Sequence, residues 1–379
     1  ESVNQNGESL SGVHFQMKNH LTLPKNWKPL GYDTDHVFSA DIDGNGYTLT
    51  VPKGGRPLLG HVGNASVSNL SIYGEQIEGY GLVNNYVVNY DYPETITIKN
   101  VTLKSGTKTL KSGLIGGYAS GSNIVRIIGC TIEPHVVIGY TGNENNIGAF
   151  AGEFNGYIDS CVNHGEVHGN NYVGGIVADK GQTMGPFEVK NCFFDGKVES
   201  SGDYVGGIVG GGYAGTNWGL ASAPNTPCVT IQNCISAGTV AGGNYVGGIL
   251  GAEPGVLNCW ENGTGYIQNN LFIGTLNASS AAYVGGIIGY MRSVDKYNII
   301  SNNYYLSDTT KLGIGAIPLV DTSCETPDLS DETVTYITTT KYARNDDPLG
   351  ADADKLSRAV TADELIDGTV TKLLNDGEN

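Results

Sequence analysis

Residues 189–210 read VKNCFFDGKVESSGDYVGGIVG, and this stretch holds three short motifs that recur along most of the chain. The first motif, apolar–x–Asn–(Cys or apolar), stands here as Val189-Lys-Asn-Cys192 and also begins at positions 67, 98, 127, 158, 231, 267 and 300. Successive starts are separated by 31, 29, 31, 31, 42, 36 and 33 residues, so a nearly constant period is lengthened by insertions. Self-similarity at such a period indicates a repeat architecture.

The other two motifs recur with the first one. Tyr204-Val-Gly-Gly-Ile-Val-Gly210 returns in related form at positions 172, 245 and 283, and Gly196-Lys-Val198 returns at 165, 238 and 274. Val, Ile and Tyr favour strands, whereas the Gly and Asn residues between them favour tight turns. Each period of about thirty residues therefore predicts three short strands with turns between them.

Three short strands cannot bury an apolar side alone, so successive periods must stack on one another. We predict an all-β, single-stranded parallel β-helix (a β-solenoid) of about eight coils, right-handed, with a C-terminal capping helix. A propeller, the main alternative, needs four strands in each blade. Stacking would align two inward ladders, formed by Ile98, Ile127, Ile158, Val189, Ile231, Ile267 and Ile300 and by Val167, Val198, Val240 and Leu276.

The ends of the chain depart from the repeat. We assign residues 1–50 to an N-terminal cap and first strands, 51–306 to the solenoid repeats, and 307–379 to an irregular segment and capping helix. Thr361-Ala-Asp-Glu364 is a capping box that predicts a helix through about Leu374, across the last coil or beside it. The chain opens at Glu1 with no visible signal peptide, which we interpret as the mature portion or a fragment of an exported protein.

Charge and composition exclude several classes of function. The 21 basic and 38 acidic side chains give a net charge of −17, which repels phosphate backbones, so we expect no nucleic-acid partner. Apolar runs such as Val173–Ala178 are far too short for membrane insertion. The seven cysteines form no CxxC pair and no zinc ligand set, and we expect no cofactor and a monomeric protein.

Several repeated polar columns are best explained as structure. We interpret the Asn column (Asn69, Asn100, Asn191, Asn233, Asn269, Asn302) as stacked amides that stabilise turns. Cys130, Cys161, Cys192 and Cys234 are expected to be small buried free thiols, although a Cys228–Cys259 loop staple remains possible. The tyrosines that begin the Gly-Gly motif, Tyr172, Tyr204, Tyr245 and Tyr283, are interpreted as packing.

Two motifs could bind metal ions. His164, Glu166 and His168 share one face of a strand and could hold a transition metal. Stacking, however, would set Glu166 against Lys197 and His168 against Glu199, so we favour a surface charge ladder. Asp41–Gly46 resembles the start of a calcium loop but lacks the acidic residue at its end, and we interpret it as a turn.

The whole pattern resembles the GLUG-motif repeat proteins of bacterial surfaces. Gly113-Leu-Ile-Gly116 stands for the family motif, and Trp27-Lys-Pro-Leu-Gly31 followed by Asp43-Gly-Asn-Gly-Tyr47 is similar to the usual start of these domains. The closing stretch 361–374 is similar to their usual finish. The resemblance covers nearly the whole chain and implies a β-solenoid, an extracellular location on a bacterial cell surface, and an adhesin-like role.

Long insertions mark the expected ligand site. The connections after the Gly-Gly strands are long in successive coils, so they should emerge along one edge, where aromatic side chains suit sugar rings or an extended peptide. An alternative is that these rings only fix their own loops. The candidate ligand-binding residues are Tyr213, Trp218, Trp260, Tyr266, Tyr290, Arg292 and Tyr297.

Three functions follow from these observations. The first is an adhesin-like protein that binds a glycan or a host or matrix protein through this loop edge. The second is a polysaccharide-active lyase or hydrolase of the β-helix type, although the sequence shows no position where acidic residues recur on adjacent coils beside a base. Asp159 and Lys190 do align on neighbouring coils, but we expect them to form an outward ion pair. The third is a passive surface spacer.

Overall fold

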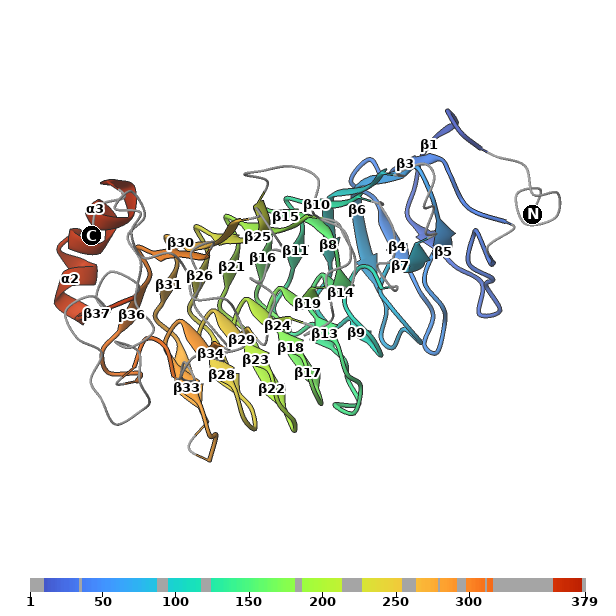
Figure 1. Ribbon diagram of the computed structural model, residues 1–379. Coiled ribbons are helices and arrows are strands. Elements are labelled where there is room, and N and C mark those ends of the chain that lie inside the picture. The colour runs from blue at the N-terminus through green and yellow to red at the C-terminus, as the bar shows by residue number, and fades with distance from the viewer. Residues whose placement is uncertain are drawn as a thin grey trace, which may run out of the picture.

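The strands stack as the coils of an elongated parallel β-solenoid, with the N-terminal strands at one end and two short helices at the other (Figure 1). This architecture confirms the predicted fold class. The computed structural model describes residues 10–33, 36–86, 95–116, 124–180, 186–212, 227–253, 264–278, 280–291, 298–310, 312–315 and 357–376.

Sheet A is the largest sheet and is built from the first motif of each coil, with 19 strands. Its first set comprises β3 (Asp41–Asp43), β6 (Ala65–Tyr73), β8 (Thr95–Leu103), β10 (Ile124–Ile128), β15 (Gly156–Asp159), β20 (Phe187–Lys190), β25 (Pro227–Gln232), β30 (Thr264–Gln268) and β35 (Asn298–Ser301). Its second set comprises β4 (Thr48–Thr50), β11 (Thr131–Ile132), β16 (Val162–Asn163), β21 (Phe193–Phe194), β26 (Ile235–Ser236), β31 (Leu271–Phe272) and β36 (Tyr304–Leu306).

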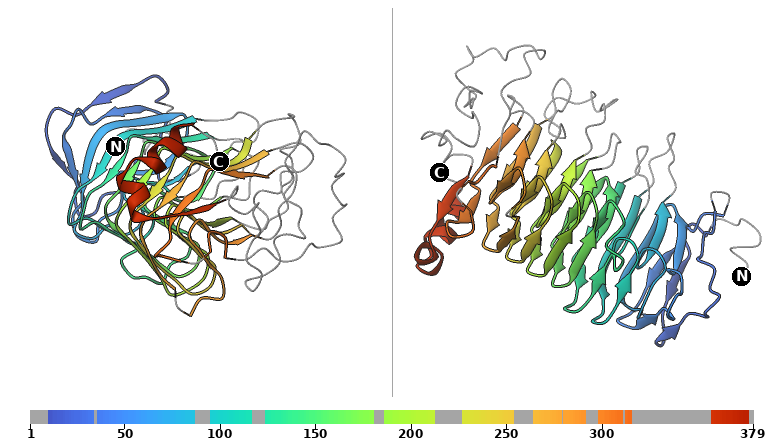
Figure 2. Two further views of the ribbon diagram at one scale, coloured as in Figure 1. Left: turned by 90° about the vertical axis from the view of Figure 1, so that its left-hand side faces the viewer. Right: turned by 90° about the horizontal axis from the view of Figure 1, so that it is seen from below.

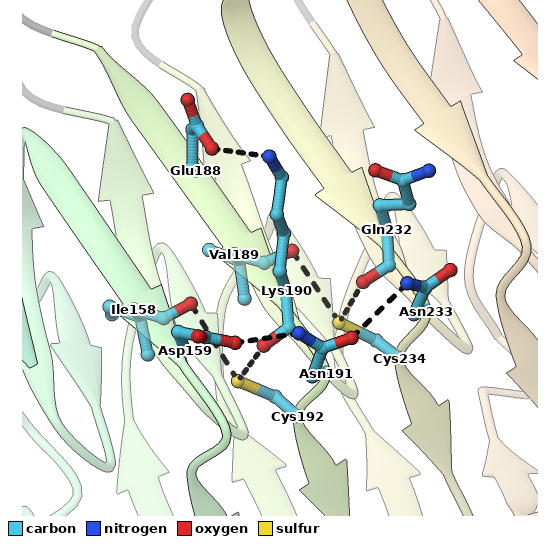
Figure 3. Close-up of polar contacts among 10 residues, drawn as sticks. All are labelled: Ile158, Asp159, Glu188, Val189, Lys190, Asn191, Cys192, Gln232, Asn233 and Cys234. Carbon is cyan, nitrogen blue, oxygen red and sulfur yellow. Dashed lines mark hydrogen bonds and ion pairs between the residues drawn. The ribbon is translucent and has the colours of Figure 1, made fainter. Parts of the chain in front are cut away.

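The asparagine column explains how the chain turns between these two sets. Asn191 has a φ of 55°, and all the other members of the column lie between 53° and 57°, which is the left-handed region that Asn tolerates better than most residues. Gly129 (φ 61°) and Ser160 (φ 55°) adopt the same conformation where the column lacks Asn. The amides also form the predicted ladder, since Asn233 Nδ2 donates to Asn191 Oδ1 at 3.1 Å (Figure 3).

The second and third motifs form the remaining sheets. Sheet C contains β9 (Lys108–Thr109), β12 (Val137–Ile138), β17 (Glu166–Gly169), β22 (Lys197–Ser200), β27 (Thr239–Ala241) and β32 (Thr275–Asn277). Sheet D contains β13 (Ile147–Gly148), β18 (Val173–Gly174), β23 (Val205–Gly206), β28 (Val246–Gly247) and β33 (Val284–Gly285). Sheet B contains β14 (Ala151–Phe154), β19 (Val177–Lys180), β24 (Val209–Gly212), β29 (Leu250–Glu253) and β34 (Ile288–Met291).

The Gly-Gly motif therefore differs from the single strand that we expected, because it forms one strand of sheet D and one of sheet B around a tight bend. Glycine is required at this bend by close backbone approach. A Cβ at Gly206 would lie 1.9 Å from the carbonyl oxygen of Val209, three residues further along the chain. The first glycine of the motif has the same surroundings in the neighbouring coils, as at Gly174 and Gly247.

Both predicted inward ladders are confirmed. The register aligns Ile127 with Ile158 and Ile158 with Val189, and the ladder continues through Ile231, Ile267 and Ile300, all of which are at most 4% exposed. In sheet C, Val167, Val198 and Val240 are fully buried above one another, and Leu276 continues the ladder half-buried against the core. Apolar side chains of similar size at the same point of each coil thus fix the register of the stack.

Non-repeating segments extend the stack at both ends. At the N-terminal end, β1 (His14–Gln16) pairs with β3, and β2 (Leu21–Thr22) pairs with β4. The short strands β5 (Leu59–Val62) and β7 (Val83–Tyr86) continue the side of the solenoid that carries sheet B, through bridges at Ile115.

The C-terminal end is closed by a strand and by two short helices, because the single predicted helix is interrupted at Gly368, whose φ is 86°. Strand β37 (Arg358–Val360) pairs with β36, and the capping box at Thr361 starts α2 (Ala362–Ile366), which is followed by α3 (Thr369–Asp376). The helices lie across this end of the rod (Figure 2). Val370 of α3 is buried with Leu271 and Tyr304 of the last coils, so the helical segment packs beside them.

Candidate functional site

Two of the seven predicted ligand-binding residues fall within the described residues. Tyr290 lies on β34 of sheet B and Tyr266 on β30 of sheet A, and both are half-buried. They therefore belong to different sheets. The other five lie outside the described residues: Tyr213, Trp218, Trp260, Arg292 and Tyr297.

Tyr290 contacts a group of tyrosines that we interpreted from the sequence as packing residues. Tyr172, Tyr204, Tyr245 and Tyr283, here called the tyrosine row, stack ring on ring at centroid distances of 4.5, 4.9 and 5.3 Å. The ring of Tyr290 lies 5.1 Å from both Tyr245 and Tyr283. All five rings are half-buried, so the predicted packing is formed and part of each side chain still reaches the surface.

The backbone is strained at three of the four tyrosines of the row. Tyr172, Tyr204 and Tyr245 have φ values of 57°, 65° and 57°, in the left-handed region that bulky residues rarely occupy. In the preceding coil the equivalent position is Asn146, with φ 56°, which suits this conformation much better. Repetition of the Tyr-Val-Gly-Gly motif gave no sign of this strain, because φ is set by the bend that follows.

The row lies against the outer side of sheet B. A Cβ at Gly211 would meet the Tyr172 ring at 3.0 Å and Tyr204 Cβ at 3.2 Å, so the glycine of β24 makes room for these two rings. The residues aligned with Gly211 in the next coils are Ala252 and then Tyr290. Small residues therefore lie beneath the rings, and Tyr290 closes the row at its C-terminal end.

Sheet B also corrects one expectation from the sequence. The register pairs Glu153 of β14 with Asp179 of β19, so two carboxylates do recur on adjacent coils, and Lys180 follows directly. Asp179 is 2% exposed and Lys180 4%. The sequence concealed this pairing because one residue separates β14 from β15, whereas residues 181–186 separate β19 from β20.

Burial changes the acid–base properties of this group. Removal from water raises the pKa of the Glu153 carboxyl, because the charged form loses hydration. The same effect lowers the pKa of Lys180 to about 8, although the negative charge of Asp179 acts in the opposite direction. Nearby, burial raises the pKa of Tyr80, with a further contribution from Glu153.

Lys180→Met is expected to stabilise the protein near neutral pH. Below about pH 8 the folded chain carries a buried ammonium, which costs up to about 3 kcal/mol relative to the unfolded chain, since one pKa unit corresponds to about 1.4 kcal/mol. This cost disappears as the pH rises from 8 towards 10.5, because the folded protein then binds fewer protons than the unfolded chain. Urea unfolding at pH 7 and pH 10 measures both values.

The control is Lys99→Met, which removes an exposed lysine from β8 and should change little at either pH. A stability gain for Lys180→Met that is equal at pH 7 and pH 10 would contradict the proposed buried charge.

Most of the other polar side chains that the sequence singled out have structural roles. The register predicted for the charge ladder is confirmed, since Glu166 aligns with Lys197 and His168 with Glu199. His168 Nδ1 lies 3.4 Å from Glu199 Oε2 on the next coil, but Lys197 Nζ pairs at 2.7 Å with Glu199 on its own strand rather than with Glu166. His164 Nδ1 lies 2.6 Å from Asp195 Oδ1. Among the described residues, no group of three or more His, Cys, Asp or Glu side chains is arranged to hold a metal ion. In the Asp41–Gly46 turn, Asp43 Oδ1 accepts a hydrogen bond from the backbone N–H of Asn45, whose φ is 52°.

The expected Asp159–Lys190 ion pair is not formed, although the two residues are in register. Lys190 Nζ lies 2.5 Å from Glu188 Oε2 on its own strand, and Asp159 Oδ1 accepts a hydrogen bond from Asn191 Nδ2 at 2.7 Å (Figure 3). The column lacks an amide at Ser160, so the amide of the next coil bonds instead to the neighbouring carboxylate.

The cysteine column is confirmed as four buried free thiols, Cys130, Cys161, Cys192 and Cys234. Each thiol donates to backbone carbonyls; Cys192 reaches the carbonyl of Lys190 at 3.1 Å (Figure 3). Asn270 and Asn303 continue the column, and Asn270 Nδ2 donates to the Ile231 carbonyl at 2.9 Å. The side chains of Cys228 and Cys259, which could form a loop staple, lie outside the described residues.

Comparison of the chain with models of known families, with curated proteins and with solved structures gives no match. The resemblance to GLUG-motif proteins therefore remains a prediction from the motifs themselves. Within the described ranges, no helix combines the length and apolar character that a membrane crossing requires.

Proposed function

We propose that this chain is a monomeric, adhesin-like protein of a bacterial cell surface that binds a glycan or protein ligand along the outer side of sheet B. The location and the adhesin role follow from the GLUG-type motifs. The binding surface is the tyrosine row together with Tyr290. In the sequence, strands β24, β29 and β34 of the same sheet are followed by Tyr213, Trp218, Trp260, Arg292 and Tyr297, whereas Tyr266 lies on sheet A. Aromatic side chains beside carboxylates suit the apolar faces and hydroxyl groups of sugars.

The strained tyrosines are the observation that carries this proposal. A left-handed backbone costs a bulky residue about 1–2 kcal/mol. Ring stacking contributes about 0.5–1.5 kcal/mol per pair beyond burial of area. Ring stacking by itself therefore does little more than offset the backbone strain, and residues held in strained conformations cluster at functional sites.

Two substitutions copy residues that the fold already accepts elsewhere. Tyr204→Asn removes a ring from the row and supplies the side chain found at the equivalent Asn146. Tyr290→Ala supplies the side chain of Ala252, which is aligned with Tyr290 in the preceding coil. Both variants should remain folded, so a loss of binding can be assigned to the missing ring.

The test is an array of glycans and candidate surface proteins probed with the whole chain. We expect at least one ligand, with binding at least tenfold weaker for Tyr204→Asn and for Tyr290→Ala. Tyr73→Ala, which removes an exposed tyrosine from β6, should bind as the unchanged protein does. Equal binding by all variants would contradict the proposed binding surface. If neither the glycans nor the proteins bind, the passive spacer becomes the favoured function.

A polysaccharide-active enzyme is the second candidate, favoured by the aligned Glu153 and Asp179 beside Lys180. A lysine with a pKa of about 8 could act as a general base near neutral pH. The Lys180 side chain is only 4% exposed, however, and a substrate must reach the amine of a catalytic base. This burial favours the ligand-binding proposal over the enzyme proposal. Release of new chain ends from acidic or neutral polysaccharides, abolished by Glu153→Gln, would establish the enzyme instead.

A further inference from the structure

A cavity of about 340 Å³ lies among the N-terminal coils, away from the tyrosine row. This volume is at the lower end of the range of small-molecule sites, about 300–1,000 Å³. The cavity is lined by Lys28, Pro29, Tyr32, Arg56, Pro57, Gly60, His61, Glu78 and Asn84.

Two successive coils build the cavity from similar segments. Residues 28–32 read KPLGY and residues 56–61 read RPLLGH, so each contributes a cation, a proline, a glycine and an aromatic ring. The segments are in register, because Leu30 bridges Leu59 and the Gly60 N–H donates to the Leu30 carbonyl at 2.8 Å. This register aligns Gly31 with Gly60 but sets Lys28 opposite Pro57, so the two cations are one residue out of line; both nevertheless line the same cavity.

Close backbone contact fixes the floor between these segments. A Cβ at Gly31 would lie 2.1 Å from the His61 carbonyl oxygen, and a Cβ at Gly60 would lie 2.2 Å from the Gly31 carbonyl oxygen. Glycine is required at both positions because the two backbones approach too closely for a side chain. Asn84 belongs to the next coil, since β5 aligns Leu59 with Val83.

The charge of this cavity is opposite to that of the whole chain. Lys28 and Arg56 are both exposed, and neither forms an ion pair with a described residue, although the protein carries a net charge of −17. Glu78 already accepts hydrogen bonds from Gln76 Nε2 at 2.9 Å and from the Tyr140 hydroxyl at 3.2 Å. Both cations are therefore available to an anion that enters the cavity.

The walls favour a ring rather than a bare ion. Pro29 and Pro57 are buried and present apolar surface, and Tyr32 is 44% exposed with its ring stacked 4.5 Å from His36. Asn84 and Glu78 are exposed polar groups that can bond to hydroxyls. A guanidinium binds a carboxylate through two parallel hydrogen bonds, which a lysine reinforces as a point charge.

We propose that this cavity binds a sugar ring that carries an anionic group, with a hexuronate residue of an acidic polysaccharide as the ligand. The carboxylate lies between Arg56 and Lys28, and the ring lies against Tyr32 and the two prolines. This site is independent of the tyrosine row, so failure of either proposal leaves the other standing.

The test titrates the whole chain with D-glucuronate, D-glucose and inorganic phosphate by ligand-observed NMR and calorimetry. We expect millimolar binding of glucuronate that weakens as the ionic strength rises, and at least tenfold weaker binding of glucose and of phosphate. Arg56→Ala should weaken glucuronate binding at least tenfold. Lys53→Ala is the matched control, because it removes a cation three residues away that already pairs with Glu75 at 2.8 Å.

Three outcomes would overturn the proposal. Equal binding of glucose and glucuronate would show that the cations play no part. Equal losses in Arg56→Ala and Lys53→Ala would reduce the effect to general electrostatics. Phosphate binding as tight as that of glucuronate would remove the role of the ring and leave a simple anion site.

Discussion

Gly206→Ala is expected to lower the free energy of unfolding by about 3 kcal/mol or more, at the high end for a single added methyl group. The new Cβ would lie 1.9 Å from the Val209 carbonyl oxygen and 2.8 Å from the Gly251 backbone nitrogen. Both neighbours are backbone atoms, one within the same bend and one in the next coil. The clash can therefore be relieved only by opening the bend between sheets D and B. Urea unfolding followed by far-UV circular dichroism measures the loss.

Gly54→Ala separates this clash from the general cost of replacing a glycine. Gly54 has a φ of 72°, and no atom lies within 4 Å of the position that an added methyl group would occupy. Its substitution should therefore cost only about 1 kcal/mol of backbone strain. If Gly206→Ala is no more destabilising than Gly54→Ala, the bend is more adaptable than its contacts indicate.

Phe194→Ala is expected to cost about 3–5 kcal/mol of unfolding free energy. The ring is fully buried between neighbouring coils, and Cβ atoms at Gly175 and Gly238 would lie 2.9 and 2.6 Å from it. Those glycines have no side chains that could move into the space left by the ring. The cavity would therefore persist, which places the cost at the upper end for such changes.

Phe193→Ala is the matched control on the same two-residue strand, β21. Phe193 is half-buried, and its ring makes an edge contact with the ring of His164 at a centroid distance of 6.2 Å. Its removal should cost about 1 kcal/mol or less, because little apolar area returns to water. Similar losses for the two variants would mean that β21 does not hold the alternation of inward and outward side chains.

The repeated motifs were enough to predict the solenoid, its period and its inward ladders. Ile158, Val189 and Ile231 recur at one point of successive coils, and a one-residue slip would turn every such side chain outward. The asparagine column was equally predictable, since Asn is favoured where the backbone adopts the left-handed conformation. Repetition makes these features predictable because each coil must bury the same apolar face and make the same turns as its neighbours.

The candidate ligand site could be predicted only in part from the sequence. The sequence pointed to the edge of the long insertions and to Tyr290, which the structure joins to the tyrosine row. It did not show that Tyr172, Tyr204 and Tyr245 occupy the left-handed region, because asparagine or glycine is the usual signal for that conformation.

Contacts between residues outside the repeated motifs could not be predicted from the sequence and became apparent in the structure. Glu153 and Asp179 are 26 residues apart and are aligned because the connection after β14 is short, whereas the first motif predicts a spacing of 31 between those coils. Lys28 and Arg56 line one cavity in coils that precede the regular repeat, where Leu30 bridges Leu59. Where insertions differ in length or the repeat has not begun, packing alone sets which side chains become neighbours, and packing exists only in the folded chain.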